Sequence, residues 1–119
     1  NPGTGETIAG AYNNQTETFF DPIDFMTANH LDHYASFTNT TLGVVATNVR
    51  LGREEATKVA QMANDGIARA ISPSHTPFDG DIVFAVSTNA VAMDNNSLLS
   101  LGTVAAKLVA WSIVEAVNH

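Results

Sequence analysis

Thr40 and Thr41 stand directly before an apolar run over residues 42–49, with no Gly, Pro or Asp turn between them. A hydroxyl at the start of a strand often reflects only good β propensity. It becomes a nucleophile if the peptide bond before it is cut, because the freed α-amine lies beside its own Oγ and can act as its base. Asn39-Thr40 has the residue types for such a cut. Thr40 is therefore a candidate nucleophile that needs no histidine.

Two carboxylates could serve this hydroxyl. In "FDGDIVF", Asp79 and Asp81 flank Gly80 immediately before a second apolar run. If that run forms a strand beside the first, both carboxylates converge on the start of the first strand and hold a protonated amine or orient the Thr40 hydroxyl. The alternative is a surface Asp-Gly turn with solvated carboxylates. The presence of both motifs in one chain favours a site.

Other chemistry-bearing side chains give weaker patterns. "HLDH" offers His30, Asp32 and His33 as metal ligands, but three groups in a Gly/Asn-rich segment lack a fourth ligand. We therefore expect neither a metal nor another cofactor. His75 lies near the aspartates and either lines a pocket or is a solvated loop residue, and the second interpretation is the more usual one.

The elements that must position these groups follow from hydrophobic periodicity. Residues 41–49 are apolar or small on both alternating faces, which predicts a strand covered on both sides. Residues 53–71 carry a helical apolar stripe, and Ser72-Pro73 ends that helix. The stripe consists of Ala56, Val59, Ala60, Ala63, Ile67, Ala70 and Ile71. Gly66 within this helix indicates close approach of another element. A second strand is expected over residues 82–88.

A last helix is expected over about residues 98–117, capped by the Asn95-Asn96-Ser97 cluster. It carries only Lys107 and Glu115 as charges, so it must be covered nearly all round. Trp111 on this helix is interpreted as a core or subunit contact. The strand-helix-strand-helix order is typical of an α/β or α+β layered domain. Two strands are too few for a sheet, so we expect the remaining strands to come from elsewhere.

Composition excludes several classes of function. The chain of 119 residues has 12 acidic and 5 basic residues, a net charge of -7, which leaves no basic surface for nucleic acid or anionic lipid. There are no cysteines for disulfides or thiolate metal sites. No apolar run approaches the roughly 18 residues of a membrane span, and no signal-peptide pattern opens the chain. These features predict a cytoplasmic protein that binds neither nucleic acid nor membrane.

Charge also divides the chain at Thr40. Five acidic residues and no Lys or Arg precede it, and all five basic residues follow it. Residues 1–39 are rich in Gly, Asn and Thr, and only "FFDPIDFM" offers an apolar cluster for docking. The sequence begins with Asn1 in a turn-rich segment. We therefore expect it to be a piece of a longer protein.

The motifs "NTTLGVVATN" and "VAQMANDGIARAISPSHTPFDGDIVFAVST" resemble the DmpA-type family of self-processing N-terminal-nucleophile amidohydrolases. The resemblance implies that Asn39-Thr40 is the self-cleavage bond, that Thr40 is the nucleophile, and that Asp79 and Asp81 position it. It implies an α+β fold, a four-layer αββα sandwich of which this chain supplies only part. Residues 1–39 would end the larger subunit and residues 40–119 would form the smaller one.

The resemblance also carries expectations about substrate and partners. The family includes D-amino-acid aminopeptidases, β-aminopeptidases and 6-aminohexanoate (nylon) oligomer hydrolases. A Thr nucleophile in this context looks closest to the last group, and the first two are alternatives. The expected partners are the remainder of the larger subunit and identical copies, a tetramer being favoured. A hypothesis of another class is a non-catalytic assembly subunit, whose intact mass would show one uncut chain.

Overall fold

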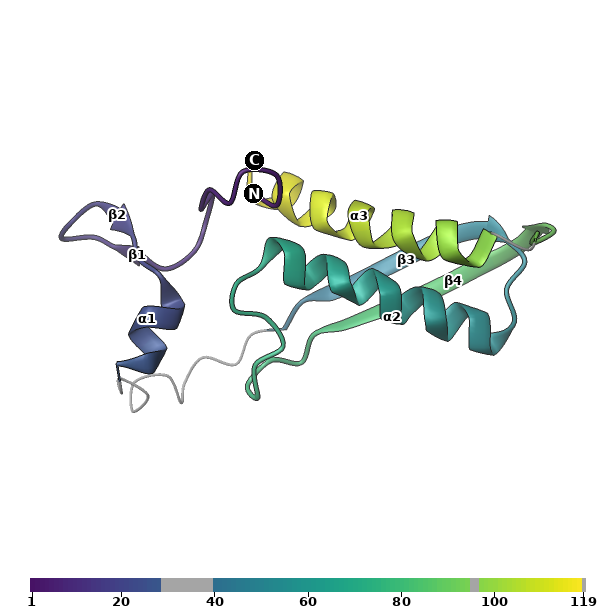
Figure 1. The fold of residues 1–119 in the computed structure, drawn as a ribbon, viewed down its shortest axis with the longest axis horizontal. Helices are drawn as coiled ribbons and strands as arrows, with labels where there is room; N and C mark the ends of the chain where they lie inside the picture. Colours follow the sequence, from purple (N-terminus) through teal and green to yellow (C-terminus); the bar gives the residue numbers. More distant parts are fainter. Residues whose placement is uncertain (29–39, 95–96, 119) are drawn as a thin grey trace.

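The computed structural model describes residues 1–28, 40–94 and 97–118. The elements in chain order are β1 (Tyr12–Asn13), β2 (Thr18–Phe19), α1 (Pro22–Thr27), β3 (Leu42–Val49), α2 (Arg53–Ala70), β4 (Ile82–Val91) and α3 (Ser97–Val117). The expected strands and helices are present, and β4 runs three residues beyond the expected end at 88. Figure 1 shows α2 and α3 running side by side along β3 and β4, while β1, β2 and α1 lie apart from them. The layered part of the chain is thus a mixed α and β arrangement.

Strands β3 and β4 pair in parallel. Leu42 lies opposite Ile82 and Val44 opposite Phe84, and the register shifts between Thr47 and Val49. Parallel neighbours need a crossover connection, and α2 supplies it. The two strands therefore begin at the same end of the sheet.

The core lies between the sheet and the two long helices. Val59, Ala63 and Ile67 on α2 have no exposed surface, and they pack with Val83 of β4 and Ala105 of α3. These α2 residues belong to the predicted apolar stripe. Their burial fixes α2 over the sheet.

Close approach of α2 and α3 depends on glycine. A Cβ on Gly66 would collide with the carbonyl oxygen of Ala106, and a Cβ on Gly102 would collide with the Met62 side chain. The expected close approach at Gly66 is therefore confirmed. Small residues on α3, with Ala110 buried next to this contact region, let the two helix backbones come together.

The two faces of the sheet differ in what covers them. Gly43, Val45 and Ala85 on the helix side are half-buried. On the opposite side the described residues leave an apolar surface, which we call the open sheet face, in which Leu42 is 70% and Val44 67% exposed. Its other large members are Ile82, Phe84 and Val86. Coverage on both sides was expected, and within the described parts of the chain only one side is covered.

Helix α3 likewise has an uncovered side. Leu99, Val104, Leu108 and Trp111 are exposed, and Lys107 Nζ lies 4.5 Å from the centroid of the Trp111 ring. Although no unbroken apolar run reaches membrane-spanning length, α3 as a whole is long and apolar enough to cross a membrane by length and composition. Its contact with α2 is equally compatible with a helix of a layered core. The full coverage predicted for α3 is not met by the described residues.

Side-chain hydrogen bonds order the starts of helices α1 and α3. Asp21 accepts a 2.8 Å hydrogen bond from the Ile23 N–H, and Pro22 begins α1. At α3, Asn95 and Asn96 of the expected cap lie outside the described residues. Ser97 Oγ donates to Asp94 Oδ1 at 2.6 Å, so Ser97 does take part in ordering this helix start.

Candidate active site

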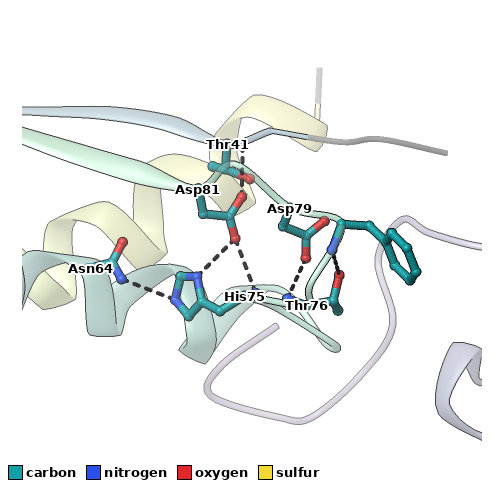
Figure 2. A network of polar contacts seen from close by, with 7 residues as sticks. Thr41, Asn64, His75, Thr76, Asp79 and Asp81 are labelled. Atoms are coloured by element: carbon teal, nitrogen blue, oxygen red, sulfur yellow. Dashed lines mark hydrogen bonds and ion pairs between the residues drawn. The ribbon is translucent and has the colours of Figure 1, made fainter.

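The amino ends of β3 and β4 are joined by two long-range hydrogen bonds. The Thr41 backbone N–H donates to Asp81 Oδ1 at 2.9 Å, and the Ile82 N–H donates to the Thr41 carbonyl at 3.0 Å. Figure 2 shows the Asp81 carboxylate pointing from the β4 side to the start of β3. The two strands thus bring residues forty positions apart in the sequence together. The convergence expected of the acidic motif is present for Asp81.

Gly80 makes room for the candidate nucleophile. A Cβ built on Gly80 would stand only 2.9 Å from Thr40 Oγ1 and within 4 Å of the Thr40 methyl group. The Thr40 side chain therefore lies directly over the Gly80 backbone, and Thr40 itself is exposed at this edge. The sequence analysis treated Gly80 only as the spacer between two aspartates. Its missing side chain is what allows the Thr40 hydroxyl to occupy this place.

Asp79 has a different local role. Its Oδ2 accepts a 2.8 Å hydrogen bond from the Thr76 N–H, and its own N–H donates to the Thr76 carbonyl at 3.0 Å. These contacts close a turn within the loop before β4. The recorded bonds of Asp79 hold the loop, whereas Asp81 reaches the neighbouring strand. A role for Asp79 at Thr40 stays a prediction.

Asp81 sits in a nearly closed polar environment. Its side chain is 6% exposed, and its Oδ2 lies 3.0 Å from His75 Nδ1 and 3.3 Å from the His75 backbone N. Burial raises the pKa of Asp81, but hydrogen bonds from the Thr41 and His75 backbone, the Thr41 hydroxyl and the charge of His75 together hold that pKa below its ordinary value. Asp81 is therefore an ionised carboxylate at neutral pH.

His75 is an exposed loop residue, as the more usual interpretation expects, but it also has fixed partners. Its ring binds Asp81 through Nδ1 and lies 3.2 Å from Asn64 Nδ2 through Nε2. Asn64 comes from α2 and was not singled out in the sequence. Its only signal was a polar residue beside an apolar stripe, which is usually a solvated position.

Some candidates cannot be placed. Asn39 and the group formed by His30, Asp32 and His33 lie outside the described residues. Across residues 1–28, 40–94 and 97–118, no three His, Asp or Glu side chains are grouped to hold a metal ion.

The layered α+β arrangement thus brings two threonines and an ionised carboxylate together at the amino ends of two parallel strands. The sequence profile of peptidase family S58 matches residues 5–119. The chain therefore belongs to peptidase family S58, the DmpA family, as its motifs predicted.

Curated relatives give two kinds of similarity. An uncharacterized aminopeptidase of Mycobacterium leprae (strain TN) is 55% identical over 53 residues, 44% of this chain and 15% of that protein. One of Mycobacterium tuberculosis (strain ATCC 25618 / H37Rv) is 51% identical over 55 residues, 46% of this chain and 16% of that protein. The 6-aminohexanoate-oligomer endohydrolase of Kocuria sp. (strain KY2) is 28% identical over 125 aligned residues, 94% of this chain and 35% of that protein. The chain thus spans at most about a third of the length of these relatives.

Gly80→Ala tests the placement of the Thr40 hydroxyl. Because the new methyl group would stand 2.9 Å from Oγ1, it must displace that oxygen. Ordinary contact begins at 3.4 Å, so the oxygen must move by a few tenths of an ångström. A displacement of about 1 Å can cost roughly 10²-fold in a reaction that depends on position, so we expect self-cleavage or substrate hydrolysis to slow measurably but by less than that factor in a rate assay. Gly3→Ala is the control, since its Cβ would meet nothing nearer than 3.4 Å. Equal rates for the two variants would contradict this placement.

Asp81→Asn tests the ionised carboxylate through stability. A carboxyl group whose folded-state pKa is depressed stabilises the fold above its unfolded pKa of about 3.9, and this contribution is lost as the pH falls through the folded-state pKa. The melting temperature of Asp81→Asn should therefore fall furthest below wild type near neutral pH, and the difference should shrink below about pH 4. Glu54→Gln, on the exposed start of α2, controls for loss of one negative charge. A difference that grew at low pH would refute the assignment.

Proposed function

We propose that the protein containing this chain is an N-terminal-nucleophile amide hydrolase that activates itself by cleaving Asn39-Thr40. The observation that carries the proposal is the Thr40 hydroxyl lying over Gly80, one residue before Thr41, whose backbone N–H binds the ionised Asp81 at the amino ends of two parallel strands. Membership in peptidase family S58 supports the same reaction class. The alternative is a non-catalytic assembly subunit, whose intact mass would show one uncut chain.

Self-cleavage would use the side chain of the residue it releases. Thr40 Oγ1 attacks the carbonyl carbon of Asn39, the carbon–nitrogen bond to Thr40 breaks, and the nitrogen takes a proton to become an amine. The product is an ester between Asn39 and the Thr40 oxygen. Water then attacks this ester, which leaves a carboxylate on Asn39 and a free hydroxyl and α-amine on Thr40.

Substrate hydrolysis would repeat the same bond changes on another amide. The neutral α-amine takes the proton of Oγ1 as this oxygen attacks the substrate carbonyl, and the amine leaving group departs with a proton. Water then hydrolyses the acyl-enzyme ester. Asp81 holds the start of β3 through the Thr41 N–H, so that hydroxyl and amine keep a fixed relation to the sheet. Asp79 is the second carboxylate of this proposal and shapes the loop that carries Gly80.

We infer linear amides as substrates, with 6-aminohexanoate oligomers first. Similarity to an endohydrolase of these oligomers extends over 94% of the chain, which favours this class. The shorter but higher similarity to mycobacterial aminopeptidases favours an aminopeptidase as the second candidate. Hydrolysis rates for 6-aminohexanoate oligomers, β-peptides and D-alanine amides, measured on the complete protein, would separate them. The scheme uses no metal or cofactor.

The uncovered surfaces support a larger assembly. The open sheet face has the composition of a sheet interior, so we propose that a second sheet, from the remainder of the larger subunit, packs on it and completes an αββα sandwich. The exposed side of α3 supports contact with an identical copy, and a tetramer is the favoured form. Both packings would cover apolar surface that the described residues leave in solvent.

A cytoplasmic location remains a prediction.

Thr40→Ala is the direct test of the nucleophile. It removes the oxygen used in both reactions, so the precursor should stay one chain and hydrolysis should be abolished. Thr40→Ser keeps an oxygen in place and should retain part of both activities. Denaturing electrophoresis with intact mass measurement reads cleavage, and the substrate panel reads turnover. Two fragments from the Ala variant would show that cleavage has another cause.

A second test concerns self-association through α3. At micromolar concentration the mature protein should sediment as a species several times heavier than one large plus one small fragment. Leu108→Asp, on the exposed side of α3, should shift it toward a lighter species because a charge on an apolar contact must be desolvated. Gln61→Glu on the exposed surface of α2 should leave the mass unchanged. Wild-type protein with the mass of a single fragment pair would refute self-association and leave the Thr40 mechanism untouched.

A further inference from the structure

His75 has an unusual backbone for its surroundings. It is a non-glycine residue with φ of 55°, in the left-handed region, within the loop between α2 and β4. This conformation costs about 1–2 kcal/mol for most residues, so surrounding contacts must hold it. The backbone N–H and the ring Nδ1 of His75 both face the same oxygen, Asp81 Oδ2. The left-handed turn is what lets one residue present both donors to one atom.

The far side of the ring is held by α2. Nδ1 faces the carboxylate, and across the ring Nε2 lies 3.2 Å from the Asn64 amide nitrogen, which donates to Nε2 when that atom carries no proton. Among the described residues, Asn64 Oδ1 is buried without a hydrogen-bond partner. Exchanging the two amide atoms would pair this oxygen with the Nε2–H of a protonated ring. Asn64 can therefore hold His75 in the same place in either charge state.

These contacts of His75 fix the orientation of the Asp81 carboxylate. Its Oδ2 accepts from the two His75 donors, and its Oδ1 accepts from the Thr41 N–H at the start of β3. Figure 2 shows this chain of contacts running from Asn64 through His75 and Asp81 to Thr41. Without the ring, the carboxylate would lose one of its two donors on Oδ2 and the restraint on its rotation.

We propose that His75, supported by Asn64 from α2, is a positioning residue that fixes the Asp81 carboxylate against Thr41, the residue that follows the Thr40 nucleophile. The inference rests on the proposed function of Thr40. His75 touches neither substrate nor the cleaved bond in this scheme and acts only through Asp81. A rigid helix thereby sets the geometry of the strand edge at which the hydroxyl lies.

Two substitutions separate the side-chain donor from the backbone. His75→Asn places an amide N–H near the position of Nδ1, and His75→Gly removes the side chain. Both Asn and Gly tolerate positive φ, so neither adds backbone strain. The readout is the first-order rate of self-cleavage of the full precursor made by cell-free translation, which needs no knowledge of the substrate. We expect His75→Gly to slow cleavage by about 10- to 100-fold, as for loss of other supporting contacts, and His75→Asn to stay within a few-fold of wild type.

Asn64 supplies a second, independent variant. Asn64→Leu removes the amide that holds Nε2 and also removes the unpartnered buried oxygen, so it should slow cleavage without lowering stability. Gln61→Leu, one turn earlier on the exposed side of α2, should leave the rate unchanged. Melting temperatures are compared in the Thr40→Ala background, where every precursor stays uncut. There both His75 variants should stay folded well above the assay temperature, with His75→Gly melting slightly lower because it lacks the side-chain donor to Asp81.

The outcomes distinguish this inference from the function on which it rests. If Thr40→Ala still cleaves, the proposed function is wrong and His75 has no nucleophile to serve. If Thr40→Ala stays intact while His75→Gly cleaves at the wild-type rate, only the positioning role is wrong. Equal slowing of the Gly and Asn variants, or slowing found only in a variant that is unfolded at the assay temperature, would also overturn it, because the side-chain donor would then not be the cause.

Discussion

The parallel register between β3 and β4 is the constraint on which the rest of this chain depends. With Leu42 opposite Ile82, the residues just before each strand also fall opposite one another, Thr41 beside Asp81 and Thr40 over Gly80. A slip of one residue would turn a whole strand over, moving its apolar side chains to the other face and Asp81 away from Thr41. The same hydrogen bonds that pair the strands therefore also assemble the candidate site.

Helix α2 packs over the two strands and also contributes Asn64 to the candidate site. Its buried residues Val59, Ala63 and Ile67 lock it over the strands, and Gly66 brings α3 close enough to close the core. Asn64 is half-buried on the same helix, so the packing of the helix also restrains its contact with His75. A site held by a helix and two strands is positioned more exactly than one held by loops alone.

The sequence predicted the elements well because their signals are local. The 3.6-residue period of α2 and the Pro after it define a helix from neighbouring residues, as does the apolar length of α3. What covers an apolar face is not local, so the open sheet face could not be predicted from a strand that is apolar on both sides. The sequence Asp79-Gly80-Asp81 likewise gives no sign that its two carboxylates have different partners. They differ because only Asp81 lies opposite Thr41, whereas Asp79 binds within its own loop. The bond between His75 and Asn64 depends on a left-handed residue in a loop, for which no sequence pattern existed.

The open sheet face has a consequence for how such a protein must be made. Strands β3 and β4, of 8 and 10 residues, expose Leu42, Val44 and Phe84 within the described parts of the chain, and such a surface is a template for intermolecular aggregation. Synthesis as one continuous polypeptide would keep the covering layer tethered nearby, at an effective concentration on the order of millimolar for a short linker. The proposed cut at Asn39-Thr40 would then be safe only after that layer has docked. If the Thr40 hydroxyl becomes reactive only when both strand starts are aligned, cleavage cannot occur before β3 and β4 have paired. The covalent link would then be cut only after it is no longer needed.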